Sequence, residues 1–294
     1  MSTHVIIIDP YPARFGALGQ RLRRCGFQVS HCEGLDAARP LLALNGGPAL
    51  TVVDERCGAT SSVAFFDELR RRSPTTTSLW VGDLPLPAQL IDAAAPSSSC
   101  ASDPHELIVR ALELLRPRLY PNAFVDFMRD EYRASLDALF GEGFTTGEVA
   151  LESAYSSIAG VSAMVSFTGR RLSGWLLVAA SFDTLTGLAS RLLPDVESFS
   201  LWEAGDVAGE IANQLLGRIK VYFTDSGLDI ELGSPVYLCG EMIRVRYPSP
   251  RPSLTLPLRG PTGTLWSELH VNGAIPKARL LPPSRPTSGE LNFL

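Results

Sequence analysis

A glutamate and an asparagine stand three residues apart, at Glu210 and Asn213, in the stretch AGDVAGEIANQLLGRIK (204–220). Apolar residues recur there every three or four positions, which predicts an amphipathic helix. Because residues three apart are neighbours on a helix surface, a carboxylate and an amide would face solvent side by side. Gly209 and Gly217 flank the pair without side-chain bulk, so a partner's surface could approach it closely.

This predicted helix contains residues that weaken helices. Glycine costs a helix interior about 1 kcal/mol relative to alanine, and asparagine is also a weak helix former. The face predicted to pack on the core carries Ala204, Val207, Ala208, Ile211, Leu215 and Ile219. The opposite face carries Asp206, Glu210, Asn213 and Gly217. A Glu–Asn pair at this spacing is common on helices that merely face solvent, so the pair alone does not establish a function.

Composition limits the class of protein. A chain of 294 residues is long enough for two domains, and 45% hydrophobic residues can build real cores. The formal net charge of −5 argues against a nucleic-acid-binding surface, which is normally basic. Five scattered cysteines without CxxC spacing indicate neither a zinc knuckle nor a disulfide framework, which fits a reducing cytoplasm. The sequence predicts no signal peptide and no membrane insertion, because its apolar runs are short.

Residues 1–116 alternate short apolar runs with helical patterns. Strands are predicted at 4–9, 28–32, 49–55, 77–83 and, more weakly, 97–102. Helices are predicted at 11–26, 35–44, 62–72, 86–95 and 106–115, with an interruption at Pro40. Asp103 and Glu106 form a capping-box pattern before the last helix. Strand–helix alternation with short connections predicts an α/β domain with a parallel sheet and helices on both faces.

The second half has a different pattern. Helices are predicted at 124–141, 182–193 and 201–227. Strands are predicted at 148–155, 158–169 and 171–181, read as a three-strand meander, and at 229–240, 242–249, 254–260 and 264–272. This grouping predicts an α+β domain over residues 123–274 with a largely antiparallel sheet. Residues 117–122 are the predicted linker, and the proline-rich residues 275–294 are a predicted mobile tail.

Acids at predicted strand ends give the first domain a recognisable pattern. Asp9 follows the first strand, and Asp54 follows the third in VVDER. Over roughly residues 3–116 the domain resembles the receiver domain of bacterial response regulators, which implies a flavodoxin-like fold with five parallel strands. A working receiver holds Mg²⁺ with two acids after its first strand and is phosphorylated on the aspartate after its third. A hydroxyl after the fourth strand and a lysine after the fifth contact the phosphoryl group.

Several of these groups are missing here. Pro10 stands at the second acidic position, Gly82 at the hydroxyl position and Cys100 at the lysine position. Mg²⁺ needs several oxygen ligands, and phosphoryl transfer depends on positioning and charge neutralisation. We therefore interpret residues 1–116 as a pseudo-receiver with a degenerate site at Asp9 and Asp54. The alternative role for Asp54 is that of a strand-end acid that caps a turn.

The second domain also resembles a known family. DVAGEIANQLLGRIK precedes a strand with Ser234-Pro235 and Cys239-Gly240, and VSFTGRRLSGWLLVAAS (165–181) comes before it. Over roughly residues 123–272 this pattern resembles the CheC/CheX/FliY family of chemotaxis phosphatases. One Glu–Asn helix is visible rather than two, which is similar to the CheX branch, whose members tend to be homodimers.

The resemblance implies a reaction and a partner. The substrate would be a phosphorylated CheY-like receiver, and Asn213 would orient a water in line with its acyl phosphate, since an amide both donates and accepts hydrogen bonds. Glu210 would pair with the partner's active-site lysine. Mg²⁺ is expected in the partner receiver, and no cofactor of this chain's own is implied. Because Cys100 replaces the lysine in its own receiver, the substrate would be a separate protein.

Two other functions remain open. A non-catalytic signalling scaffold would bind a receiver or an array component through the same surface. An active response regulator would be phosphorylated on Asp54 and use the second domain as output. The four histidines show no metal-ligand spacing, and no GxSxG or glycine-rich phosphate loop is present. Trp175 and Trp202 are predicted to be packing residues.

Overall fold

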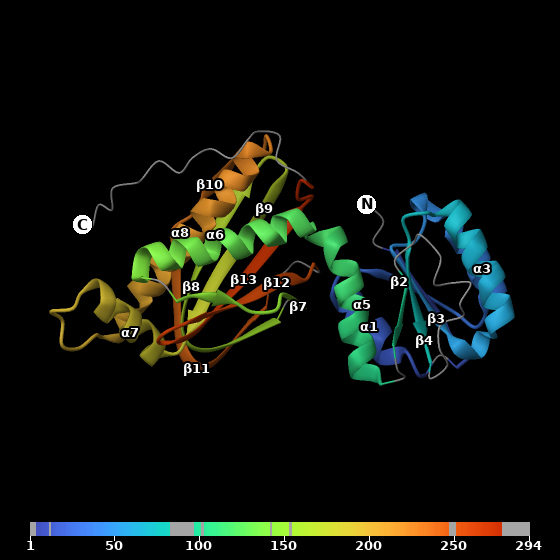
Figure 1. Cartoon of the computed structure of the whole chain (residues 1–294), viewed down its shortest axis with the longest axis horizontal. Coiled ribbons are helices and arrows are strands. Elements are labelled where there is room, and N and C mark those ends of the chain that lie inside the picture. The colour runs from blue at the N-terminus through green and yellow to red at the C-terminus, as the bar shows by residue number, and fades with distance from the viewer. Residues whose placement is uncertain are drawn as a thin grey trace. The chain divides into compact units, whose positions relative to one another are not determined.

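A computed structural model describes residues 4–11, 13–82, 97–100, 103–141, 143–152, 155–246 and 251–277. The chain folds into two compact units (Figure 1). The first comprises the residues up to Leu119 together with two short later segments, Leu151–Ala154 and Tyr247–Pro252. The second comprises Tyr120–Ala150, Tyr155–Arg246 and the segment from Ser253. Within the described part of the chain, no helix is both long and apolar enough to cross a membrane.

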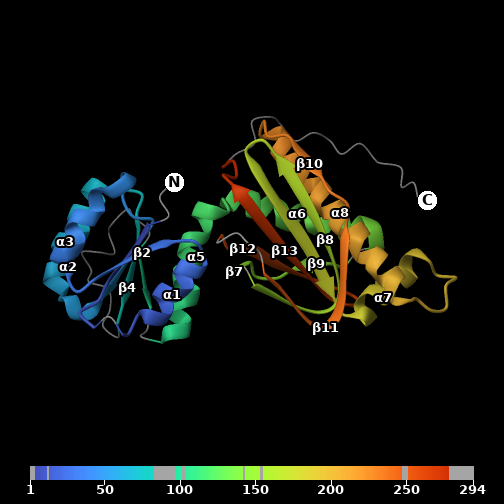
Figure 2. The ribbon, with the colours of Figure 1, turned by 180° about the vertical axis from the view of Figure 1, so that it is seen from behind.

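The first unit is a five-stranded parallel sheet in the order β2-β1-β3-β4-β5. Its strands are β1 (His4–Ile8), β2 (Gln28–Cys32), β3 (Leu50–Asp54), β4 (Thr77–Val81) and β5 (Ser97–Cys100). Its helical segments are α1 (Gly16–Arg24), α2 (Leu35–Ala38), η1 (Arg39–Gly46), η2 (Glu55–Cys57), α3 (Ala59–Arg72) and α5 (Pro104–Leu119). Figures 1 and 2 show α1 and α5 on one face and α2 and α3 on the other. The predicted receiver-like α/β fold is confirmed.

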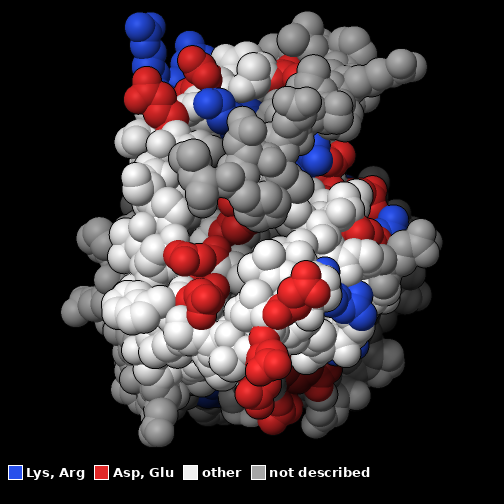
Figure 3. Space-filling model, turned by 90° about the vertical axis from the view of Figure 1, so that its left-hand side faces the viewer, with Lys and Arg blue, Asp and Glu red and all other residues white. Residues whose placement is uncertain are grey.

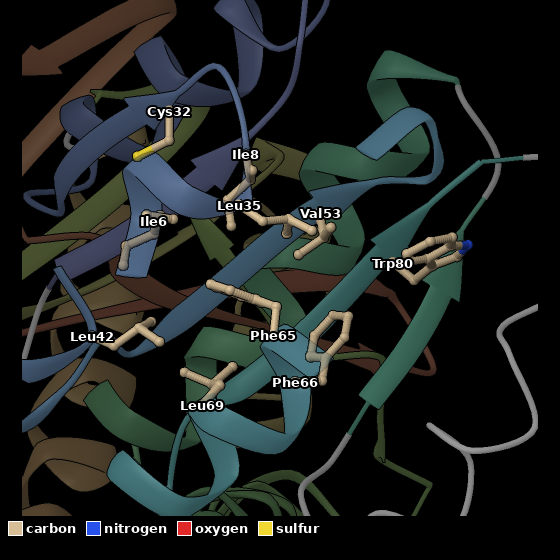
Figure 4. Packing of buried hydrophobic residues seen from close by; sticks show 11 residues of the cluster. Ile6, Ile8, Cys32, Leu35, Leu42, Val53, Phe65, Phe66, Leu69 and Trp80 are labelled. Atoms are coloured by element: carbon tan, nitrogen blue, oxygen red, sulfur yellow. The ribbon is translucent and has the colours of Figure 1, made fainter. Parts of the chain in front are cut away.

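Burial explains the near-continuous apolar sequence of the central strands. Every residue of β3 and β4, and all but the first of β1, is buried, because helices cover both faces of a parallel sheet. Figure 4 shows the packing between the sheet and α3: Phe65, Phe66 and Leu69 of α3 belong to one buried cluster with Ile6, Val53 and Trp80 of the sheet. The acidic strand ends are therefore fixed to a rigid core.

Two helices of this unit have bounds that differ from the predicted ones. The helix expected from residue 11 begins at Gly16, and the one expected over 35–44 leaves α-helical form after Ala38. Pro40 has no N–H to donate, and the chain continues as the 3₁₀ segment η1. The backbone N–H groups of His105 and Glu106 donate to Asp103, which therefore caps α5 and supplies the Asp103 half of the predicted capping box. The helix predicted at 86–95 lies outside the described residues.

The second unit is an α+β layer with an eight-stranded antiparallel sheet, which confirms the predicted class. Its strands are β6 (Thr145–Thr146), β7 (Ala150–Glu152), β8 (Tyr155–Gly169), β9 (Leu172–Ala180), β10 (Ile230–Leu232), β11 (Val236–Arg246), β12 (Ser253–Gly260) and β13 (Gly263–Gly273). Its helices are α6 (Asn122–Phe140), α7 (Phe182–Leu192) and α8 (Leu201–Asp225). The main order is β10-β8-β9-β13-β12-β6.

The pairing differs from the predicted meander. β8 pairs with β9, but β7 pairs with β12 instead of β8. The segments predicted as separate strands at 229–240 and 242–249 form short β10 and long β11, and β11 has a register shift between Gly240 and Ile243. Sequence alternation identifies strands but does not identify partners that lie far apart in the chain.

Helix α8 positions the Glu–Asn pair. Ser200 and Glu203 form a reciprocal capping box, which fixes where the helix begins. Five of the six residues predicted for the core face are buried: Ala204, Ala208, Ile211, Leu215 and Ile219. The sixth, Val207, is half-buried. α8 also packs against α6, where the rings of Phe124 and Phe223 stack with centroids 5.7 Å apart. These contacts fix which face of α8 points outward.

The segments proposed as linker and tail have the following structure. Residues 117–119 complete α5, and Leu119 is buried. Asn122 already begins α6. Ile275 at the start of the predicted tail is buried, and residues from 278 on lie outside the described part of the chain.

Candidate functional sites

Glu210 and Asn213 lie side by side on the half-buried outer face of α8. Gln214 Nε2 donates a hydrogen bond of 2.8 Å to Glu210 Oε1, which holds the carboxylate along the helix. Among the described residues, the Asn213 side chain has no hydrogen-bond partner. The structure thus presents an oriented carboxylate beside an amide that can still bind a water or a partner.

The glycines of α8 do not all leave open surface. A Cβ at Gly209 would lie 2.8 Å from Tyr237 Cε1, and one at Gly205 would lie 3.6 Å from Tyr237 Cδ1. The two glycines therefore make room for the Tyr237 ring of β11, so the expectation that Gly209 leaves space for a partner is wrong. A Cβ at Gly217 would meet nothing within 4 Å, and this position is open as predicted.

Tyr237 joins the outer face of α8 to the sheet edge. Burial raises the pKa of its phenol, and the charge of Asp206, a hydrogen bond to Asp206 and the charge of Glu210 raise it further. The hydroxyl therefore stays protonated at neutral pH and lies beside two carboxylates. Sequence reasoning missed Tyr237, because only the fold brings β11 against α8.

The two tryptophans singled out from the sequence have different environments. Trp175 is buried and stacks on His270 at a centroid distance of 5.4 Å, which confirms its packing role. Trp202 in the first turn of α8 is 77% exposed, so its predicted packing role is wrong. The amphipathic pattern did not reveal this exposure, because the first turn of a helix often extends past the core it covers.

The first unit brings Asp9 and Asp54 together at the carboxyl ends of neighbouring strands, and both are buried. Arg56 Nε and Nη2 donate to the Asp54 oxygens at 2.8 and 2.9 Å, and Arg14 Nη1 donates at 2.6 Å. Arg56 Nη2 also lies 3.5 Å from Asp9 Oδ1. Two guanidinium groups therefore neutralise the carboxylate that would accept phosphate in a working receiver.

Backbone contacts complete this arginine-closed site. The Arg56 N–H donates to Asp54 Oδ1 at 2.8 Å, so Asp54 caps the turn η2, which is the alternative role that its position offered. The Tyr11 N–H donates to Asp9 Oδ1 at 2.8 Å, and the Tyr11 ring lies 4.6 Å below the Arg56 guanidinium. Arg14 and Arg56 were missed from sequence, although Arg56 stands two residues after Asp54 in VVDER.

The two carboxyls have opposite pKa shifts. Burial raises the pKa of Asp54, but hydrogen bonds from Arg56 and the charges of Arg14 and Arg56 outweigh it, and the net shift is downward. Burial raises the pKa of Asp9; the Tyr11 N–H and the arginines oppose this, and the charge of Asp54 adds to it. Asp9 Oδ2 is buried without a hydrogen-bond partner among the described residues.

The residues present do not fit the Mg²⁺ of a working receiver. Arg56 already spans both carboxylates, and Arg14 binds Asp54 Oδ2 as well. A side chain at Gly82, the position of the family's hydroxyl, would overlap the Glu55 carboxylate. Within the described ranges, no three acidic, histidine or cysteine side chains gather as a metal site would require.

Comparison with known proteins assigns the second unit. Residues 161–259 match the family described as chemotaxis phosphatase CheX, and this segment contains α8 with Glu210 and Asn213. The chain therefore carries a CheX domain, preceded by a receiver-like α/β domain. None of the curated proteins matches this chain.

Solved structures are similar to separate parts of the chain. CheX of Desulfovibrio desulfuricans is 17% identical, covering 50% of this chain and 98% of its own, with a TM-score of 0.45. A CheX–CheY–BeF₃–Mg²⁺ complex from Borrelia burgdorferi is 19% identical, covering 50% and 96%, with a TM-score of 0.42. A receiver domain from Bermanella marisrubri is 21% identical, covering 39% and 99%, with a TM-score of 0.32.

The open position on α8 leads to a stability prediction. Gly217→Ala should raise the free energy of unfolding by up to about 1 kcal/mol, because alanine favours the helix and its methyl group meets no neighbour. Gly209→Ala is the matched control and should gain less, because the Tyr237 ring must move. Thermal unfolding of the full chain measures both, and a destabilised Gly217→Ala variant would contradict the open position.

The arginine-closed site leads to a pH prediction. The Asp54 pKa is below its unfolded value of about 3.9, so its stabilising contribution is complete above that pH and is lost as pH falls through the folded pKa. Hydrogen exchange at the β3 amides should show protection that decreases on acidification below about pH 4. Asp54→Asn should lower protection at pH 7 and flatten this acid dependence. An unchanged acid dependence in Asp54→Asn would rule out Asp54 as its source.

Proposed function

We propose that the CheX domain of this protein hydrolyses the aspartyl phosphate of a separate, phosphorylated CheY-like receiver. The single observation that carries the proposal is the Glu210–Asn213 pair on the outer face of α8, with the Asn213 amide unpartnered among the described residues. The match of residues 161–259 to the chemotaxis phosphatases supports assigning a phosphatase role to this pair.

The proposed reaction needs positioning more than acid–base chemistry. The Asn213 amide accepts a hydrogen bond from a water and orients its oxygen in line with the acyl phosphate. A new P–O bond forms, and the bond to the partner's aspartate breaks as its carboxylate leaves. An acyl phosphate is already reactive, so no general base from this chain is needed. Mg²⁺ held by the partner receiver neutralises the developing charge.

Glu210 acts in docking. Its carboxylate pairs with the lysine of the partner's active site, and the hydrogen bond from Gln214 keeps it in the required rotamer before the partner arrives. A preformed rotamer lowers the entropy lost on binding. Glu210 therefore sets the position in which Asn213 meets the phosphate.

The receiver-like domain of this chain is proposed to be a regulatory or localising module. Arg14 and Arg56 already neutralise Asp54, and Cys100 stands where a receiver lysine would pair with Glu210. Its phosphoryl-accepting chemistry is closed, so the substrate is supplied in trans. We also propose that the protein is cytoplasmic, as its cysteine pattern suggests. We propose that it forms a homodimer, as the resemblance to CheX suggests.

A non-catalytic scaffold is the second candidate. It would bind a receiver or an array component through the same face of α8 without hydrolysis. The half-buried Glu210, fixed by Gln214, favours docking in either case. The two candidates differ only in what Asn213 does once the partner is bound.

The phosphatase proposal predicts that Asn213→Ala loses activity without losing binding. Receivers encoded in the same genome are phosphorylated with a small phosphodonor, and phosphate release is followed with and without the full chain. At least one receiver should lose phosphate faster, and Asn213→Ala should slow this about a hundredfold, because the water is no longer positioned. Equal release with wild type and Asn213→Ala would leave the scaffold as the function.

The pseudo-receiver interpretation predicts that Asp54 of this chain is not phosphorylated. Incubation with a small phosphodonor and Mg²⁺ should leave Asp54 unlabelled, because arginine side chains bind both of its carboxylate oxygens. Mass spectrometry of the intact protein measures this, with a receiver that has a complete site as the positive control. A phosphorylated Asp54 would instead support the response-regulator function.

A further inference from the structure

An exposed aromatic surface continues from the Glu–Asn pair toward the start of α8. Trp202, Asp206 and Asn213 follow one another at helical spacing and share one side of the helix. The Tyr237 ring fills the interval over Gly205 and Gly209 and is 39% exposed. We call Trp202, Asp206 and Tyr237 the docking ridge. Trp202 lies about 16 Å along the helix axis from Asn213, at a rise of about 1.5 Å per residue.

The exposure of Trp202 is the feature that most needs a partner. A tryptophan that is 77% exposed leaves a large apolar area in water, and tryptophan and tyrosine are enriched among residues that dominate binding energy. Tyr237 is held against the helix before any partner binds, so contact with its exposed edge costs little side-chain entropy. The two rings form a preorganised contact surface.

The negative charge of the segment 182–210 indicates that the partner's contact surface is basic. Between residues 182 and 210 the chain has six acidic residues and one basic residue, Arg191. This segment accounts for the whole formal net charge of −5, and the remaining residues are electrically balanced. Figure 3 shows acidic side chains gathered in the middle of the side of the molecule that carries α7. Arg191 donates to the Phe140 carbonyl, so its guanidinium is already engaged.

We propose that the docking ridge selects the partner receiver, by binding a face that presents lysine or arginine around an apolar pocket. The inference rests on the proposed function, since Glu210 and Asn213 define where the partner lies. Trp202 enters the apolar pocket, and Asp206, with Glu203 and Glu210 one turn away on the same helix, attracts the basic rim. Electrostatic complementarity of this kind governs encounter rate and partner choice.

The test separates docking from catalysis. Receivers from the same genome, activated with BeF₃⁻ and Mg²⁺, are titrated with the full-length protein, and the dissociation constant is measured. Trp202→Ala should raise it about tenfold, as loss of a binding hot spot does. Trp266→Ala is the matched control, because Trp266 is 51% exposed on β13, outside the ridge, and should leave binding unchanged. Asp206→Asn should weaken binding and reduce its salt dependence.

Turnover completes the test. At saturating phosphorylated receiver, Trp202→Ala should retain the maximal rate of phosphate release, whereas Asn213→Ala should lose it. Equal dissociation constants for wild type and Trp202→Ala would overturn the ridge and leave the role of Asn213 intact. Binding that depends on Trp202 without any phosphate release would support the ridge and refute the phosphatase. No binding to any receiver would overturn both.

Discussion

The burial of one side of α8 is the constraint on which the functional face depends. Ile211, Leu215 and Ile219 are fully buried, and the period of 3.6 residues then forces Glu210 and Asn213 to the opposite side. The capping box at Ser200 fixes where the helix begins and so which residue occupies each position on the two faces. The pair proposed for catalysis therefore needs no loop to hold it, because the core of the domain orients the helix that carries it.

The key carboxylates of the two domains have different partners. In the receiver-like domain, Asp54 is buried, and Arg14 and Arg56 supply its charge balance from within the chain. On α8, the Glu210 carboxylate accepts a hydrogen bond from the neutral Gln214 amide, and among the described residues no cation of this chain pairs with it. An acid paired with arginines in one domain and an acid without a cation partner in the other agree with the proposal that the chain acts on receivers and is not itself phosphorylated.

Local patterns predicted much of the fold and the inward and outward faces of α8, because helix and strand periods and strand-end acids are properties of neighbouring residues. Long-range contacts could not be predicted in the same way. The pairing of β7 with β12, the seat of Tyr237 on Gly205 and Gly209, and the reach of Arg14 to Asp54 join residues far apart in sequence. Gly205 and Gly209 illustrate this limit. Their spacing on the helix can be read from the sequence, but the Tyr237 ring that packs against them cannot.

The most direct measurement is a single-turnover experiment in which excess full-length protein is mixed with a phosphorylated receiver and phosphate release is followed over a range of protein concentrations. We predict that Asn213→Asp abolishes the saturating rate constant, because the added negative charge repels the phosphoryl oxygens and no longer leaves a neutral amide at the attacking water. We also predict that Gln214→Ala mainly raises the concentration needed for half-saturation. A saturating rate constant that Asn213→Asp leaves unchanged would contradict the central claim that this amide positions the attacking water.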